Sequence, residues 1–314
     1  MQNVRNRQAP AQRLRQHLKK YWRLHVMALP VLICLALFSY APMLGLVMAF
    51  QKVNIGKGIL RSPFIGLKNF EFLFKTQDAW VITRNTVCYN LVFITLDTSL
   101  ALILSLILNE LLSQRLAKGI QTILIMPHFL SMAVIAMIVS AFMGKQYGLV
   151  NAVRQMMGLK AVDWYITRSV WPPLLVFINA WKTVGYSAVV YLATISGISH
   201  EYYEAAVLDG ASKLQQALYI TLPYMRPMIS IMLIMAVGNI FRGDFGLFYT
   251  VPQNNGMLYP VTNVIDTYIY RALTTLNNPG MATAAGLYQS AVGFVLVLIA
   301  NKIVTCIDAD SAMF

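Results

Sequence analysis

The sequence contains few charged residues and very few acidic ones. Only 12% of its 314 residues are charged, and 25 lysines and arginines stand against 12 aspartates and glutamates, a formal net charge of +13. Soluble globular domains contain about 25% charged residues. The charged share of this chain is well below that, and 58% of its residues are hydrophobic. The composition therefore excludes an ordinary soluble domain and indicates a membrane protein. In such a chain the positive charge indicates how the protein is oriented in the membrane and where it contacts lipid headgroups. No nucleic-acid-binding motif accompanies this charge.

Cysteine is scarce as well. Cys34, Cys88 and Cys306 are an odd number and lack the paired spacing of a disulfide framework or a zinc site. Because they fall in or beside apolar stretches, we expect them to be small buried hydrophobic residues. The histidines near the ends of apolar stretches have no partner at metal-ligand spacing either. We therefore expect no metal site.

The motifs of nucleotide hydrolysis and of common hydrolases are also missing. The chain has no Gly-x-x-x-x-Gly-Lys-Ser/Thr loop, no Gly-x-Ser-x-Gly and no His-Glu-x-x-His. The chain cannot supply its own ATP hydrolysis, and we expect that it is not an enzyme and binds no cofactor of its own. A polytopic lipid-modifying enzyme would need acidic or histidine clusters at the membrane surface, and Asp266 and Glu201 stand apart from any such cluster.

Six apolar stretches are long enough to cross about 30 Å of hydrocarbon at about 1.5 Å per residue. They predict an all-α integral membrane protein with six transmembrane helices. The predicted spans are residues 26–50, 86–109, 120–143, 172–198, 228–249 and 283–304.

A basic segment precedes the first stretch. The stretch itself is too long for a signal peptide, and no small-residue cleavage site follows it. The positive-inside rule therefore places residues 1–24 in the cytoplasm, although the expected outer loops carry basic residues too. Six spans return the carboxyl terminus to the same side. We divide the chain into this cytoplasmic segment, a transmembrane domain at 25–306 and a cytoplasmic tail at 307–314. The basic residues are Arg5, Arg7, Arg13, Arg15, Lys19, Lys20 and Arg23.

A polar segment separates the fourth and fifth stretches. It reads Glu204-Ala205-Ala206, then Asp209-Gly210, then, after nine residues, Ile220-x-Leu222-Pro223. This pattern resembles the EAA loop of permease subunits in bacterial ABC importers. An ordinary amphipathic hairpin would explain the turn and the proline, but not the whole spacing. The resemblance implies that residues 199–226 dock in a groove of a cytoplasmic ATPase through Glu204, Ala205, Ala206, Asp209, Gly210, Leu222 and Pro223.

The residue types in this loop suit such a dock. Glu204 and Asp209 offer carboxylates to donors on a partner, and Gly210 permits the chain to reverse. We expect a second helix from Ala211 that Pro223 ends, with Pro227 opening the fifth span.

Other strings between about residues 22 and 302 are similar to the carbohydrate-importer branch of these permeases. Within it they resemble the polysaccharide-type (LplB-like) permeases and the permease of the alginate importer. The resemblance implies the type I ABC importer permease fold and import of an oligo- or polysaccharide across the bacterial cytoplasmic (inner) membrane. It also implies a second homologous permease subunit, two ATPase subunits that use ATP and Mg²⁺, and an extracytoplasmic solute-binding protein. The strings include 66–70 (GLKNF), 126–131 (MPHFLS) and 265–271 (IDTYIYR).

Charged side chains inside apolar stretches are costly and usually face a cavity or a partner. Glycines interrupt the fifth stretch beside Asn239, Arg242 and Asp244, the pattern of a helix that unwinds at a transport site. Lys182 and Tyr186 lie one helical turn apart in the fourth stretch. We take these five residues as candidates for the saccharide pathway. The alternative is that Arg242 pairs with Asp244 and that Lys182 reaches the outer interface.

Two other functions stay open. An ion-coupled secondary transporter is favoured by Asp97 within the second stretch and by the interrupted fifth stretch. The other is the permease of an ABC importer for a solute that is not a carbohydrate. Uptake driven by an ion gradient without any ATPase would identify the secondary transporter.

Overall fold

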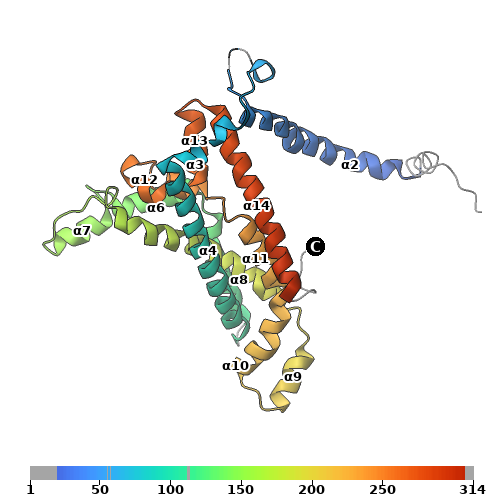
Figure 1. Cartoon of the computed structure of the whole chain (residues 1–314). Coiled ribbons are helices and arrows are strands. Elements are labelled where there is room, and N and C mark those ends of the chain that lie inside the picture. Colours follow the sequence, from blue (N-terminus) through green and yellow to red (C-terminus); the bar gives the residue numbers. More distant parts are fainter. Residues whose placement is uncertain (1–19, 55, 57, 112–113, 308–314) are drawn as a thin grey trace, which may run out of the picture.

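The computed structural model describes residues 20–54, 56, 58–111 and 114–307, and this part of the chain is helical throughout its regular structure (Figure 1). No β-strand occurs within these residues, apart from an isolated bridge between Gln51 and Phe64. The predicted boundaries near residues 24 and 307 stay predictions, because residues 1–19 and 308–314 lie outside the described ranges.

Within the described residues, five helices are long and apolar enough to cross a bilayer, and a bent pair brings the number to six. The prediction of an all-α membrane protein is therefore confirmed, and the predicted six spans are reached when the bent pair counts as one span. The five are Trp22–Phe50, Gln77–Asn109, Arg168–Ile195, Lys213–Gly238 and Pro279–Cys306, and the bent pair is Arg115–Phe129 with Met132–Met143.

The first span projects away from the other helices (Figure 1). It consists of α2 (Trp22–Leu35), the π-helix η1 (Ala36–Tyr40) and the 3₁₀-helix η2 (Ala41–Phe50). None of its most apolar window is buried, although η2 packs on α14 (Pro279–Ile307) at its far end. A helix that exposes apolar side chains all round needs lipid or another chain as its surroundings.

The remaining spans form a bundle. The long helix α4 (Gln77–Asn109) packs along α8 (Trp171–Ile195), and α14 packs on α11 (Leu222–Gly238) and on α13 (Ile265–Thr274). One apolar core lies among α4, α8 and α11. Its fully or nearly fully buried members include Ala101, Ala188, Tyr191 and Met225.

A second core lies at the other end of α8. It surrounds the fully buried Trp171 and includes Leu247 of the π-helix η8 (Gly246–Thr250) and Ile135 of α6 (Met132–Met143). The shorter elements are η3 (Ile59–Arg61), η4 (Gly66–Phe70), α3 (Phe72–Lys75), α7 (Leu149–Met156), η6 (Arg168–Val170), η9 (Gly256–Leu258) and α12 (Tyr259–Thr262).

The third predicted span is bent rather than straight. The helix α5 (Gln114–Ile125) continues into η5 (Met126–Phe129), and the chain then turns by 94° into α6. Ser131 adopts an extended backbone, and its hydroxyl accepts a hydrogen bond from the Val134 N–H to cap α6. Pro127 lies in the first turn of η5. The uninterrupted helix expected over 120–143 is therefore wrong.

The fifth span begins earlier and ends earlier than expected. The elements α10 (Lys213–Gln216), the π-helix η7 (Ala217–Thr221) and α11 form one span over Lys213–Gly238. Pro223 lies in the first turn of α11 and Pro227 lies inside it, so neither proline ends or opens a helix as predicted. The wider π-turn just before Pro223 is a known way for a helix to absorb a local break in its hydrogen-bond ladder.

The expectation for the cysteines was also wrong. Cys34, Cys88 and Cys306 are all exposed. They lie on faces of α2, α4 and α14 that no other described helix of this chain covers. An apolar stretch predicts that a residue enters the membrane, but not that it enters a protein core.

Candidate functional site

The predicted coupling loop forms a short helix beyond the end of the bundle. Helix α9 (His200–Leu208) and α10 lie at the end opposite α3 and α13 (Figure 1). The Ser199 hydroxyl caps α9 by accepting from the Glu201 N–H. At its other end, Gly210 has φ 79°, a conformation that suits glycine, and the Ala211 N–H donates to the Ala206 carbonyl at 2.9 Å. The predicted turn is thus present at Asp209-Gly210.

The tip of this loop is open to a partner. Glu204, Ala205, Asp209 and Gly210 are exposed, and Leu208 is 89% exposed beside them. The structure therefore brings the first five predicted docking residues, Glu204 to Gly210, together on α9 and the turn that follows it. Leu222 and Pro223 lie apart from them, half-buried in the first turn of α11.

Contacts that the sequence did not reveal hold the loop in place. The hydroxyls of Tyr203 and Thr221 lie 2.9 Å apart and join α9 to η7. The Lys213 ammonium lies 3.1 Å from the Glu110 carboxylate just beyond the end of α4. The Lys213 side chain is 71% exposed and the Glu110 side chain is 38% exposed. Because solvent screens such a pair, it orients the loop more than it stabilises it. Tyr203 and Thr221 lie eighteen residues apart in sequence, and no local pattern pairs them.

The predicted interruption of the fifth span is present. Helix α11 ends at Gly238, and the chain runs without regular helix until η8. Two carbonyls of this turn accept hydrogen bonds from the Asn90 side chain of α4, Ile240 at 3.0 Å and Arg242 at 2.9 Å. An amide side chain at membrane depth thus satisfies backbone groups that the helix has released.

The other side of the turn is held by α13 and α14. The Gln289 amide donates to the Phe241 carbonyl at 2.5 Å and to the Asp266 carboxylate at 2.8 Å. The same carboxylate accepts from the Gly243 N–H at 2.5 Å. Burial raises the pKa of Asp266, while these two hydrogen bonds lower it. Asn90, Gln289 and Asp266 hold the turn and were missed by sequence reasoning, although Asp266 stands in one of the family-like strings.

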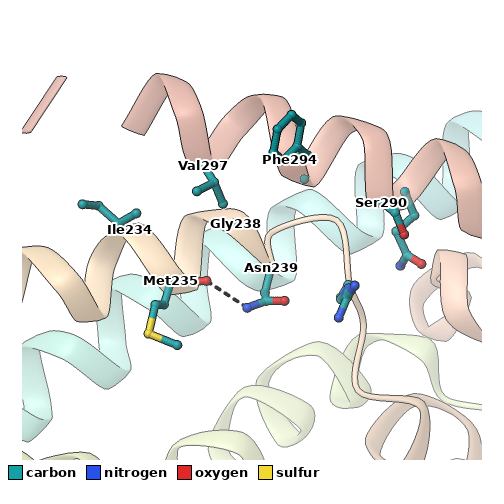
Figure 2. Close-up of a pocket in the computed structure, with 10 residues that line it drawn as sticks. Ile234, Met235, Gly238, Asn239, Ser290, Phe294 and Val297 are labelled. Carbon is teal, nitrogen blue, oxygen red and sulfur yellow. Dashed lines mark hydrogen bonds between the residues drawn. The ribbon is translucent and has the colours of Figure 1, made fainter. Parts of the chain in front are cut away.

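Two of the pathway candidates line one cavity. Figure 2 shows this space, about 290 Å³, between α11 and α14, with Asn239 on one wall and Ser290 on the other. The Asn239 amide donates to the Met235 carbonyl at 2.9 Å, which is the dashed line in Figure 2. Arg242 lines the same cavity.

The alternative, a pairing of Arg242 with Asp244, is absent from the described structure. No ion pair within 4.0 Å joins them in the described structure, and both residues are exposed. Asp244 instead accepts a hydrogen bond from the Leu247 N–H at 2.9 Å, where the chain re-enters helix. The Arg242 guanidinium is therefore available to a ligand or to another chain.

The other two candidates lie at the bend of the third span. The Lys182 ammonium donates to the His128 carbonyl at 2.9 Å and to the Leu130 carbonyl at 2.6 Å. The Tyr186 ring stacks on the His128 ring, with centroids 4.6 Å apart and planes 12° from parallel. Lys182 therefore does not reach out to the interface, and it does not share the cavity of Arg242.

A second polar cavity lies among α4, α8 and α11. It has a volume of about 240 Å³ and is lined by Asp97, Asn179 and Asn239 among others. One Asp97 oxygen accepts from the Asn179 amide at 2.8 Å and from the Thr183 hydroxyl at 2.9 Å, and its buried second oxygen has no hydrogen-bond partner in the described chain. Because Asn239 lines both cavities, the unwound turn lies between them.

Comparison with known proteins places these features in a family. Residues 97–306 match the family described as "Binding-protein-dependent transport system inner membrane component". The chain is 31% identical over 280 residues to the polygalacturonan/rhamnogalacturonan transport system permease protein YteP of Bacillus subtilis, covering 89% of this chain and 87% of that protein. It is 29% identical to protein LplB of the same organism, covering 93% and 92%.

A solved structure agrees with the sequence relatives. The fold matches a chain of a bacterial ABC transporter involved in the import of the acidic polysaccharide alginate, with a TM-score of 0.85 and 32% identity over 94% of this chain and 99% of that one. A structure of the bacterial alginate ABC transporter in complex with a pentasaccharide-bound periplasmic protein matches with a TM-score of 0.83 and 32% identity, covering 94% and 98%. The chain therefore belongs to the binding-protein-dependent transport system inner membrane components, and it is a multi-pass ABC transporter permease whose homologues carry sugars and polysaccharides.

Proposed function

We propose that this chain is a permease subunit of an ATP-driven importer of oligo- or polysaccharides. It forms half of the translocation pathway and couples to cytoplasmic ATPases through the loop at 199–226. The family consists of transport subunits that are not enzymes themselves. The observation that carries the proposal is a physical connection between an exposed docking helix and an unwound turn inside the membrane.

That connection is one helical span. The loop tip leads through Gly210 into Lys213–Gly238, whose 26 residues extend roughly 39 Å at about 1.5 Å per residue. The far end of this span is the turn that carries Asn239 and Arg242. A displacement of α9 by closing ATPases would move the whole span, since a helix transmits force along its axis. Access to the cavities beside the turn would then alternate with the ATPase cycle.

The partner set follows from the same features. The first span leaves its apolar window unburied, which suits contact with a second homologous permease. The cavities beside the turn, about 290 and 240 Å³, are too small to enclose a polysaccharide within one bundle. We therefore propose two permeases on two ATPases, which use ATP and Mg²⁺, with saccharide delivered by an extracytoplasmic binding protein.

The pathway residues divide by role. Asn239, Arg242 and Asp244 lie at the unwound turn and are proposed to contact saccharide. Tyr186 is 49% exposed and offers a ring to sugar from α8. Lys182 has a positioning role, because its ammonium is bonded to carbonyls at the bend.

Reconstitution tests the function. Proteoliposomes that contain the chain with its partner permease, ATPases and binding protein should take up oligosaccharide only with ATP. The competing secondary transporter draws support from the unpartnered Asp97 oxygen. Uptake driven by a proton or sodium gradient without ATPase subunits would favour that alternative. ATP-driven uptake of a solute other than a carbohydrate would favour an importer of another class.

A further inference from the structure

A third cavity lies at the end of the molecule opposite the coupling loop. It has a volume of about 390 Å³ and is bounded by the start of α4, by α12 and by α13. Its lining includes Asp78, Tyr259, Asn263, Tyr268 and Arg271. This combination of two aromatic rings, an acid and a guanidinium in one concavity is not used by the coupling loop or the unwound turn.

Arg271 is held in this cavity by neutral groups alone. Its guanidinium donates to the side-chain oxygens of Asn254, at 3.3 Å, and of Asn263, and its centre lies 4.2 Å from the centroid of the Tyr259 ring. No carboxylate of the described chain lies within 4.0 Å of it. The hydrogen bonds to the two asparagines use only part of the five N–H donors of a guanidinium.

The environment makes this cation expensive to keep without an anion. Burial lowers the pKa of the Arg271 guanidinium, although arginine stays charged at any physiological pH. A partly buried charge normally has a counter-ion or a ligand. Asp78 lines the same cavity, but beyond ion-pair distance of Arg271.

We propose that this cavity is a saccharide subsite in which Arg271 binds the carboxylate of a uronic acid ring. The inference rests on the proposed saccharide-importer function and names an acidic saccharide as the substrate. A guanidinium binds a carboxylate through two parallel hydrogen bonds. Tyr259 and Tyr268 line the cavity and offer apolar ring surface to the sugar, and the Asp78 carboxylate accepts from sugar hydroxyls. The volume lies in the range of small-ligand sites.

An acidic side chain of the binding protein is the competing occupant. An acidic surface of the binding protein would first meet the exposed cations of this region, Arg84 and Arg168. Arg84 donates to the Pro260 carbonyl, and Arg168 donates to the Met257 carbonyl. Arg271 is set back among tyrosines and asparagines, where a small ring fits better than a protein surface.

The test compares an acidic and a neutral trisaccharide of equal length. Trigalacturonate and maltotriose are offered to the purified transporter complex without binding protein, and binding is followed by saturation-transfer NMR. Arg271→Gln removes the charge but keeps hydrogen-bonding groups. Arg168→Gln is the matched control, because that arginine contacts the same loop without lining the cavity.

We expect Arg271→Gln to weaken trigalacturonate binding by about ten- to a hundredfold, the size of a charge-assisted hydrogen-bond loss. Wild type should bind maltotriose no better than Arg271→Gln does. Trigalacturonate binding by Arg168→Gln should stay within about twofold of wild type. If Arg271→Gln does not fold, Arg271→Lys keeps the charge without the planar fork and should weaken trigalacturonate binding to an intermediate degree.

Equal binding of trigalacturonate by wild type and Arg271→Gln overturns the subsite. Loss of binding-protein association in Arg271→Gln, with sugar absent, overturns it in favour of the protein occupant. The importer function is judged separately by ATP-driven uptake in proteoliposomes. Trigalacturonate binding that depends on Arg271 without any ATP-driven uptake would keep the subsite and overturn the importer.

Discussion

The ammonium of Lys182 donates a hydrogen bond of 2.6 Å to the carbonyl of Leu130, fifty-two residues earlier in the sequence. This contact joins α8 to the 94° bend between η5 and α6. Backbone carbonyls released inside a membrane need donors from the protein itself, because no water is present to supply them. A lysine that the sequence suggested for the pathway thus supports the bend.

Replacing Lys182 by methionine should lower the free energy of unfolding by about 2 to 3 kcal/mol, because two carbonyls lose a charged donor. Thermal unfolding of the purified protein in mild detergent measures this change. Lys118→Met is a suitable control, since Lys118 lies exposed on α5. Unchanged stability of Lys182→Met together with lost saccharide uptake would instead assign Lys182 to the pathway.

Replacing Asn90 by alanine should destabilise the unwound turn. Its amide serves the carbonyls of Ile240 and Arg242, and leaving both without a donor costs about 1 to 3 kcal/mol. The same unfolding assay gives the magnitude. The matched variant Thr95→Ala, which removes only a bond to the carbonyl one turn earlier on α4, should change stability by less than about 0.5 kcal/mol. Equal effects of the two variants would contradict the account of the turn.

The crossing of α11 and α14 depends on close contact at Gly238. A Cβ atom there would overlap a methyl of Val297. Gly238→Ala should therefore destabilise the protein by about 1 to 3 kcal/mol through overpacking. The double variant with Val297→Ala should recover part of that loss. Gly286→Ala on α14, where nothing lies within 4 Å, should be neutral or slightly stabilising. Failure of Val297→Ala to relieve Gly238→Ala would reject the contact.

The carboxyl group of Asp266 gives a pH dependence with a definite sign. Burial raises its pKa, so the folded protein favours its protonated form more than the unfolded chain does. The protonated carboxyl therefore contributes its full stabilisation of the folded protein below pH 3.8, the ordinary pKa of this group. That stabilisation declines as pH rises through the raised pKa of the folded protein. Arg242 is the cation that opposes this shift. As pH rises above 3.8, unfolding temperatures should fall less steeply in Asp266→Asn than in wild type, and a steeper fall in the variant would contradict the assignment.

The sequence predicted features that depend on local residues. Membrane spans follow from apolar length, the turn after α9 follows from Asp209-Gly210, and the unwound segment follows from Gly238-Asn239 and Gly243. Each of these depends on what a short stretch of chain can or cannot do by itself. The exposure of Glu204 on the short helix α9 agrees with the same reasoning.

Features that depend on distant partners were not predictable. A proline normally interrupts a helix, yet α11 runs past Pro227, and the π-turn at η7 precedes Pro223. The bend near Leu130 is supported by Lys182 from another helix, and Asp266 meets Gly243 only through the packing of α13. Sequence spacing carries no direct record of such contacts.

Helix α9 is proposed to dock on an ATPase. Co-purification of candidate carbohydrate-importer ATPase subunits with the chain, in mild detergent and at equal expression, tests this docking. Glu204→Ala removes the exposed carboxylate, and Gly210→Pro replaces a residue at φ 79° by one fixed near −65°. Glu201→Ala is the control on the same helix. The account predicts that wild type and Glu201→Ala retain the ATPase while the other two variants lose it. Retention by all four proteins, or by none, would contradict it.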